Sequence, residues 1–187
     1  MKRFWNKLRY IFLKQIKPEI IGGWKNANGV YQKYTRISNM THISQRGDNL
    51  YLGDNVVVEH FSYIDGVHAK VTICDNVQVG YYCSIITHST HNSIRFNLEE
   101  FLNCTGEIYI GANTFIGPHS VVMPGTHIGK GCIVSAYSFV KGDFPDYSIL
   151  RGQPAKIIGD TRNIDAKILE QYPDLKSTYY LKDENNL

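Results

Sequence analysis

The sequence predicts a β-helix built from short parallel strands, and two regularities support this prediction. From Ile110 to Val140 an apolar residue returns at every sixth position, and a small residue follows four positions after each of the first five. The apolar positions are Ile110, Ile116, Val122, Ile128, Val134 and Val140, and the small ones are Thr114, Ser120, Thr126, Cys132 and Ser138. A period of six matches neither an amphipathic helix nor a half-buried strand. Three such repeats make one triangular coil, so residues 110–127 and 128–145 are expected to stack as two coils.

The same spacing runs through the preceding part of the chain, with three longer steps. The steps that begin at Ile43 and Ile64 are nine residues long, and the step that begins at Ile85 is 25. Because these three positions are 21 residues apart, all three longer steps fall at the same corner of the triangle. The last one forms a loop of about residues 86–109. Long loops in compact domains usually carry function, and this one contains a Thr-His-Ser-Thr-His segment that begins at Thr87.

The first 17 residues predict an amphipathic helix, which Pro18 ends. They hold six of the 20 basic residues and no acidic one, so the rest of the chain has 14 basic and 17 acidic residues. A basic body that would bind nucleic acid is therefore excluded. The helix is expected either to cap the open end of the β-helix or to contact the inner surface of a membrane.

Three regions follow from these patterns. Residues 1–36 are expected to hold the amphipathic helix and a connector, residues 37–158 the β-helix with its long loop at 86–109, and residues 159–187 a short C-terminal helix and tail. A chain of 187 residues is enough for one domain. It contains neither a long apolar segment nor a secretory signal, and its four cysteines form no CxxC pair. We therefore expect a cytoplasmic protein with reduced thiols.

The segment Ile128–Val140, IGKGCIVSAYSFV, and the segment Gly152–Ile158, GQPAKII, resemble the C-terminal signature of the hexapeptide-repeat acyltransferases. Within that left-handed parallel β-helix family the resemblance is to the galactoside, maltose and surface-polysaccharide O-acetyltransferases, and it covers about residues 34–160. It implies an all-β fold of about five to six left-handed coils, and a homotrimer with active sites between subunits. It also implies an acetyl-CoA-dependent O-acetyltransferase that needs no metal and acetylates a saccharide hydroxyl, in the biosynthesis of capsule or O-antigen.

The resemblance further implies a histidine in the long loop as general base. His91 occupies the position of the histidine in the polysaccharide branch, so it is the expected base, with His88 as the alternative. A neutral imidazole accepts a hydroxyl proton at pH 7. Glu59 and Asp65 match positions near the acceptor, where a carboxylate orients the imidazole, holds sugar hydroxyls or stays solvated. The galactoside branch has asparagine at the position of Glu59. Arg95 binds an acidic or nucleotide-linked acceptor, or holds the loop in place.

A second group of residues matches the family's donor groove. The residues expected to bind acetyl-CoA are Phe115, Gly117, Ser135, Ala136, Lys141 and Lys156. The two lysines would meet the phosphates, and Ser135 with Ala136 matches a small pair beside the pantetheine. Tyr137 departs from the pattern because the family usually has glycine there, which implies a narrower groove.

Three other functions remain as alternatives. The first is an N-acetyltransferase of a nucleotide-linked amino sugar, which needs the same base. The second is a catalytically silent β-helix scaffold. The third is a zinc-dependent carbonic anhydrase, in which two of three histidines are usually five residues apart. The spacings between successive histidines here are 18, 8, 20, 3, 28 and 8, so the third alternative is disfavoured.

Overall fold

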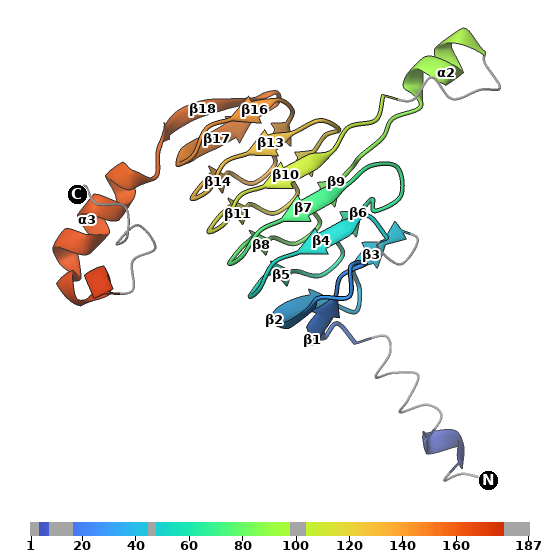
Figure 1. Ribbon diagram of the computed structural model, residues 1–187, viewed down its shortest axis with the longest axis horizontal. Helices are drawn as coiled ribbons and strands as arrows, with labels where there is room; N and C mark the ends of the chain where they lie inside the picture. The colour runs from blue at the N-terminus through green and yellow to red at the C-terminus, as the bar shows by residue number, and fades with distance from the viewer. Residues whose placement is uncertain (1–3, 8–16, 45–47, 98–103, 178–187) are drawn as a thin grey trace.

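The computed structural model describes residues 4–7, 17–44, 48–97 and 104–177. Their strands wind into a triangular column whose three sides are sheets (Figure 1). Sheet A contains β1 (Ile20–Lys25), β2 (Tyr31–Ser38), β5 (Val57–Val58), β8 (Gln78–Val79), β11 (Phe115–Ile116), β14 (Ile133–Val134), β17 (Ser148–Gly152) and β18 (Ala155–Asp160). Sheet B contains β3 (His42–Ile43), β6 (Tyr63–Ile64), β9 (Ser84–Ile85), β12 (Val121–Val122) and β15 (Phe139–Val140). Sheet C contains β4 (Leu50–Leu52), β7 (Val71–Ile73), β10 (Ile108–Ile110), β13 (His127–Ile128) and β16 (Asp143–Phe144).

The six-residue repeat forms the coils as predicted. The chain passes through sheets A, B and C in turn, and each short strand pairs in parallel with the strand one coil further on. Ile110, for example, lies opposite Ile73 on one side and Ile128 on the other. The six apolar positions from Ile110 to Val140 are completely buried, and each side chain of this kind stabilises the fold by roughly 1.5–3 kcal/mol. The predicted β-helix and its two stacked coils are therefore confirmed.

The small residues occupy the corners. The five predicted positions are at most 2% exposed, and their hydroxyl groups, or the thiol of Cys132, donate to backbone carbonyls near the turn. Thr114 Oγ1 donates to the Gly129 carbonyl at 3.0 Å, and Ser138 Oγ donates to the Ser135 carbonyl at 2.7 Å. A larger side chain at these positions would collide with the coil itself.

The three lengthened steps all lie where sheets B and C meet, as predicted. We call this corner of the column the B/C edge. The link from β6 to β7 stays close to the column, whereas the described parts of the link from β9 to β10, residues 86–97 and 104–107, form an arm that carries α2 (His91–Phe96) (Figure 1). The two legs of the arm pair at its base. Ser89 and Cys104 exchange two backbone hydrogen bonds of 3.1 and 3.2 Å, and Gly106 N–H donates to the Thr87 carbonyl at 3.0 Å.

An antiparallel hairpin of β1 and β2 lies where the sequence analysis expects a connector. Trp24 packs against the core from this hairpin. The side chain of Asn26 bonds to both backbone groups of Leu52, at 2.8 and 2.9 Å, and so substitutes for a strand at the edge of sheet C. Of the predicted amphipathic helix, residues 4–7 are helical and exposed, and the remainder lies outside the described residues. Within the described part of the chain, the hairpin is what covers this end.

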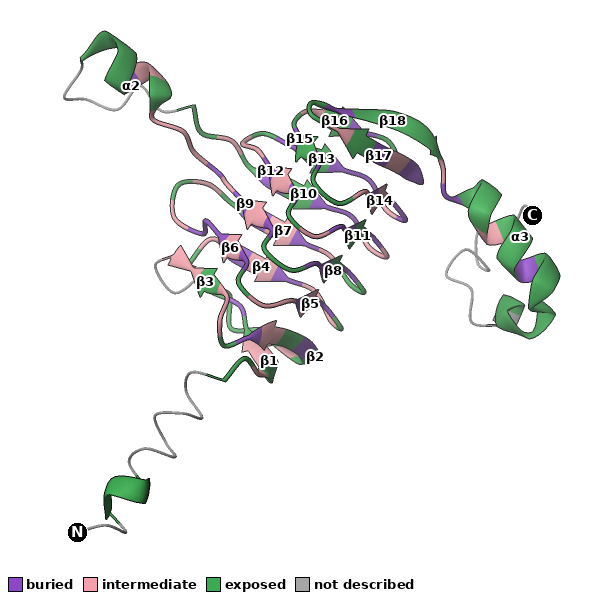
Figure 2. Cartoon of the chain, turned by 180° about the vertical axis from the view of Figure 1, so that it is seen from behind, coloured by how far each residue is buried: buried purple, intermediate pink, exposed green. Residues whose placement is uncertain are grey.

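The C-terminal region begins with a second antiparallel hairpin, formed by β17 and β18. It continues into α3 (Arg162–Gln171) and a 3-10 helix, η2 (Pro173–Ser177), which confirms the predicted short helix before Pro173. Both β18 and α3 are largely exposed and extend away from the column (Figure 2). No helix among the described residues is long and apolar enough to cross a membrane.

Candidate active site

A histidine and an aspartate from neighbouring coils form a hydrogen-bonded pair at the B/C edge. Asp65 directly follows β6, and His88 lies shortly after β9, at the base of the arm. The Nδ1 atom of His88 is 2.6 Å from Oδ2 of Asp65. The two residues meet because β6 and β9 pair in parallel with Ile64 opposite Ile85, so the residues that follow these strands lie one above the other.

The Asp65 side chain is completely buried and is held by donors from three coils. Its carboxylate accepts hydrogen bonds from Ser44 Oγ at 3.2 Å, Val67 N–H at 3.2 Å, Thr87 N–H at 3.3 Å and Thr87 Oγ1 at 2.6 Å. Burial by itself raises the pKa of this carboxyl, but the hydrogen bonds from Thr87, His88 and Val67 outweigh it and hold the pKa well below its usual range. Asp65 is therefore ionised at neutral pH.

The ionised carboxylate selects the tautomer of His88. A carboxylate can only accept hydrogen bonds, so Nδ1 of His88 carries the proton that bonds to Asp65. In the neutral ring the lone pair is then on Nε2, which is free to accept a proton from another molecule. The His88 side chain is 26% exposed. The pair thus has the two parts of a general base, an orienting acid and a ring that solvent or substrate can reach.

A second histidine, His68, joins this pair. Its Nδ1 atom is 3.4 Å from Oδ2 of Asp65, and its ring stacks on that of His88 with the centroids 3.6 Å apart and 27° between the planes. The sequence analysis did not select His68. The available signal was the three-residue lengthening of the step after Ile64, which supplies the residues that bring His68 to this place.

The three side chains also form a candidate metal-ligand group, since their donor atoms lie within 4.8 Å of one another. The chemistry of two imidazoles and a carboxylate suits zinc. The arrangement does not, because the two rings are stacked with 27° between their planes, whereas ligands of tetrahedral zinc approach the ion from well-separated directions. The separation of 2.6 Å between His88 and Asp65 is also shorter than the roughly 3.3 Å between ligands around tetrahedral zinc. The geometry is therefore that of a hydrogen-bonded pair.

The other predicted residues of the reaction centre lie elsewhere. His91 is exposed at the start of α2, with Nδ1 2.7 Å from Ser89 Oγ. Arg95 is exposed on the same helix, with its guanidinium 5.9 Å from the centre of the Phe96 ring. Glu59 lies at a different corner, where Gln78 Nε2 donates to it at 3.2 Å. The carboxylate that contacts a loop histidine is Asp65, and its burial leaves no surface for the acceptor contact that the sequence analysis assigns to it.

Most residues predicted to bind the donor gather where sheets A and B meet, which we call the A/B edge. Gly117 lies directly against Ser135 and Ala136 of the next coil, since a Cβ atom at Gly117 would lie only 2.5 Å from the Ala136 nitrogen. Phe115, 38% exposed, precedes this corner on β11. A small residue is thus required at Gly117 by the backbone that passes above it.

The two predicted donor lysines lie at different edges. Lys156 is exposed on β18, paired in register with Arg151. The turn that precedes it packs onto the A/B edge, where Gln153 Nε2 donates to the Tyr137 carbonyl at 2.8 Å. Lys141 follows β15 and is exposed at the B/C edge. The structure therefore brings Lys156, but not Lys141, to the edge that carries Gly117.

Tyr137 belongs to a column of stacked rings along the A/B edge. Phe61, Tyr82, His119 and Tyr137 follow one another with centroid separations of 5.1, 4.9 and 4.7 Å. All four have positive φ, between 57° and 61°, a conformation that costs an ordinary residue roughly 1–2 kcal/mol. Each stacking contact between two rings stabilises the fold by about 0.5–1.5 kcal/mol, which offsets this cost. This explains how tyrosine stands at a position that favours glycine.

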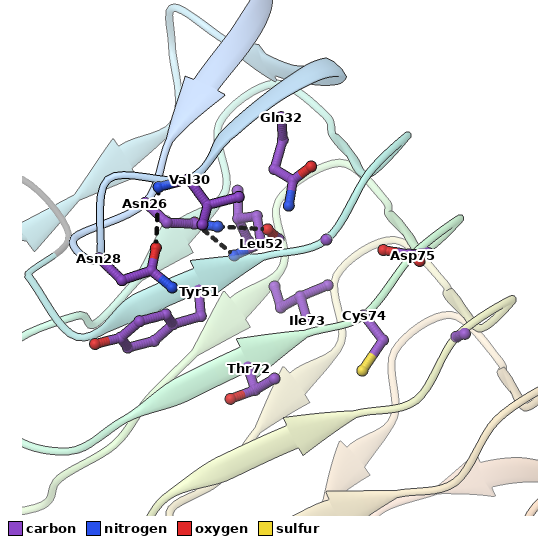
Figure 3. A pocket seen from close by; sticks show the side chains of 12 residues that line it. Asn26, Asn28, Val30, Gln32, Tyr51, Leu52, Thr72, Ile73, Cys74 and Asp75 are labelled. Atoms are coloured by element: carbon purple, nitrogen blue, oxygen red, sulfur yellow. Dashed lines mark hydrogen bonds between the residues drawn. The ribbon is translucent and has the colours of Figure 1, made fainter.

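Two hollows on sheet C lie apart from both groups of residues. One, of about 320 Å³, lies beside the N-terminal hairpin and is lined by amide side chains together with Tyr51, Thr72 and Cys74 (Figure 3). The other, of about 330 Å³, contains Lys70 and Tyr109. A hydrogen bond with Cys74 and burial raise the pKa of Tyr109 to about 12, so this phenol stays protonated at neutral pH.

The low pKa of Asp65 predicts a loss of stability in acid. Between the ordinary pKa of about 3.8 and the lower folded value, the unfolded chain binds more protons than the folded one. The free energy of unfolding therefore falls as the pH falls below about 3.8. Asp65→Asn should lose about 1–3 kcal/mol at pH 7 and should lack this acid-dependent part. Urea unfolding of both proteins from pH 3 to pH 7 tests this, with exposed Asp143→Asn as control. Parallel pH profiles of wild type and Asp65→Asn would contradict it.

Comparison with known proteins adds to this geometry. The family model described as bacterial transferase hexapeptide (six repeats) matches residues 107–142. A Staphylococcus aureus protein, named by inference as an acetyltransferase, is 39% identical over 120 residues, or 64% of this chain. The chain spans 57% of the length of that relative.

Two solved structures resemble the column. A galactoside acetyltransferase in complex with coenzyme A has a TM-score of 0.57 and 29% identity, over 67% of this chain and 62% of the other. A hexapeptide-repeat acetyltransferase of Vibrio cholerae in complex with acetyl-CoA has a TM-score of 0.58 and 27% identity, over 64% of each chain. These matches agree with the resemblance drawn from the sequence. The column is a left-handed parallel β-helix similar to those of solved hexapeptide-repeat acetyltransferases.

Proposed function

We propose that the chain is an acetyl-CoA-dependent O-acetyltransferase that modifies a saccharide hydroxyl, with His88 as its general base. The observation that carries the proposal is the Asp65–His88 pair, in which a buried carboxylate holds a partly exposed imidazole at 2.6 Å. Among the described residues, the hydrogen-bond partner of His91 is the Ser89 hydroxyl, which can donate as well as accept and so does not select a tautomer. The match to acetyltransferases whose structures hold coenzyme A or acetyl-CoA supports the donor.

The reaction follows from the tautomer of His88. Nε2 of His88 takes the proton of the acceptor hydroxyl, and the hydroxyl oxygen attacks the carbonyl carbon of the thioester. The tetrahedral intermediate then collapses, the bond from carbon to sulfur breaks, and the imidazolium returns its proton to the leaving thiolate. The products are the acetyl ester and free coenzyme A, with no acetylated enzyme between them. Asp65 stabilises the imidazolium that forms, as a buried carboxylate does beside other catalytic histidines.

We also propose that the site lies between two chains of a homotrimer. In one chain the base is at the B/C edge and Gly117, Ser135 and Lys156 are at or near the A/B edge. These edges are separated by one side of the triangle, six residues or at most about 20 Å in length. Reacting atoms must approach to about 3–3.5 Å, so a second chain that presents its A/B edge to His88 would complete the site. The exposed Ile94 and Phe96 of α2, 77% and 65% accessible, would then be covered by that chain.

We extend the proposal to the acceptor and to where in the cell the reaction occurs. A surface polysaccharide or its precursor is the acceptor class that the resemblance favours, with cytoplasmic synthesis beside the membrane. The basic N-terminal segment, whose Phe4 and Trp5 are 66% and 67% exposed, suits contact with an anionic lipid surface. Assays with paired hydroxyl and amine acceptors separate O-acetylation from the alternative N-acetylation.

Replacement of the base is the first test. His88→Ala should lower kcat by roughly 10²- to 10⁴-fold, the usual loss when a general base is removed. His91→Ala should keep kcat within about threefold, because none of the carboxylates in the described part of the chain holds the His91 ring in place. Release of coenzyme A from acetyl-CoA in the presence of a saccharide acceptor measures both. The reverse pattern would make His91 the base, and equal activity in all three proteins would remove the histidine mechanism.

Donor binding is the second test. Lys156→Ala should weaken acetyl-CoA binding by roughly 3- to 10-fold, because one charge-assisted contact with a phosphate is lost. The matched control is Lys33→Ala, which removes the same charge from β2 at the opposite end of sheet A. Thermal shift with increasing acetyl-CoA measures the two affinities. A wild-type protein without any shift at millimolar acetyl-CoA would favour the silent scaffold.

Complementation is the test of the shared site. His88→Ala removes the base, and Ala136→Trp fills the A/B edge, so each variant alone should be inactive. Trimers assembled from an equal mixture should regain about a quarter of wild-type activity, because a quarter of the interfaces then join an intact base to an intact donor edge. An inactive mixture of correctly assembled trimers, or a fully active monomer by mass, would contradict a site built from two chains.

A further inference from the structure

None of the described residues forms a short hydrogen bond with His68 that would explain its position. Oδ2 of Asp65 has two short contacts, from Thr87 Oγ1 and from His88 Nδ1, both at 2.6 Å. Thr87 N–H also donates to this oxygen, at 3.3 Å, so three donors already share its two lone pairs. The Nδ1 atom of His68, at 3.4 Å, lies outside the usual range of an N–H···O hydrogen bond. The main contact of His68 is therefore the stacking on the ring of His88 and not a hydrogen bond to the carboxylate.

Residues 66–68, in the lengthened step after Ile64, are held to the column by hydrogen bonds. Gly66 N–H donates to Ser44 Oγ at 3.0 Å, and Val67 N–H donates to Asp65 at 3.2 Å. The Asn49 side chain donates to the Val67 carbonyl at 2.8 Å, and the Asn49 N–H donates to the Gly66 carbonyl at 3.2 Å. These bonds fix the residues on the N-terminal side of His68. The ring of His68 is thus presented to His88 from a defined piece of backbone.

Stacking restricts a motion that the hydrogen bond to Asp65 leaves open. One bond at Nδ1 fixes a single atom of the His88 ring, so the ring can still tilt out of line with the carboxylate, which breaks this bond and removes the preference for one tautomer. His68 covers one face of the ring, with centroids 3.6 Å apart, and so limits the tilt. A base must hold its geometry within about 10–20° to work well, and a misplacement of about 1 Å can cost 100-fold in rate.

We propose that His68 is a positioning residue whose ring, by stacking on His88, keeps that imidazole against Asp65. The proposal rests on the proposed role of His88 as general base. The flat ring of His68, and not its nitrogen atoms, is what holds the His88 imidazole in place. His68 therefore acts on the reaction through the ring of His88.

Three variants of His68 separate the ring from its nitrogen atoms. His68→Ala removes both, His68→Phe keeps a flat ring, and His68→Gln keeps a polar group of similar length without a ring. His68→Ala should lower kcat by about 10- to 100-fold with KM changed by less than about threefold. His68→Phe should recover kcat to within a few-fold of wild type, and His68→Gln should not. His42→Ala is the matched control, because His42 stacks on Tyr63 elsewhere on sheet B and should leave kcat unchanged.

Nitrogen-15 NMR of the His88 ring gives a readout that does not depend on acetyl transfer. Wild type and His68→Phe should show one tautomer with its proton on Nδ1, whereas His68→Ala should show an average of the two tautomers. Thermal unfolding should stay within about 4 °C of wild type, because His68 is at the surface. If His88→Ala proves fully active but the NMR pattern holds, the function fails and the positioning role stands. A single tautomer and unchanged kcat in His68→Ala would overturn the proposal, as would recovery by His68→Gln but not by His68→Phe.

Discussion

The closure of each coil in register with the next is the constraint on which the structure depends. One aliphatic residue in six must point inward from each side, and it must meet its counterpart one coil away, as Ile73, Ile110 and Ile128 do. An extra residue within a side would turn the following side chains to the wrong face. Added residues are therefore tolerated only at a corner. The chain uses one corner for all three of its lengthened steps, and the candidate reaction centre lies there.

The stacking of these lengthened corners also makes a buried carboxylate possible. Asp65 follows β6, Ser44 follows β3 one coil before it, and Thr87 follows β9 one coil after it. A lone carboxylate in this place would be strongly destabilising, because burial removes its hydration. The hydroxyl groups of Ser44 and Thr87 and the backbone of Val67 replace that hydration. The same bonds leave one short contact for His88, so the stability of the corner and the orientation of the base have a common cause.

The sequence pattern predicted the coils, the corners and the arm, because each follows from spacing along the chain. The family position favours His91 over His88 as the base, and spacing along the chain does not show that the ring of His88 is the one that reaches a carboxylate 23 residues earlier. Family positions place both Glu59 and Asp65 near the acceptor, whereas the register of Ile64 with Ile85 brings only Asp65 of these two to the base of the arm. The N-terminal hairpin was missed because a six-residue period does not detect antiparallel strands. Its turn signal, Asn28-Gly29, is present in the sequence.

The A/B edge has a chemistry of its own. Its four stacked rings adopt a backbone conformation that would be easier for glycine, so each ring is retained at some cost to its own turn. The contacts between rings offset that cost only while the row of stacked rings is unbroken, because a ring such as His119 has neighbours on both faces. The conformation of each of these turns therefore depends on the rings of the coils next to it. A groove beside Ser135 and Ala136 would have a rigid aromatic wall, whose shape is set by residues as distant in sequence as Phe61 and Tyr137.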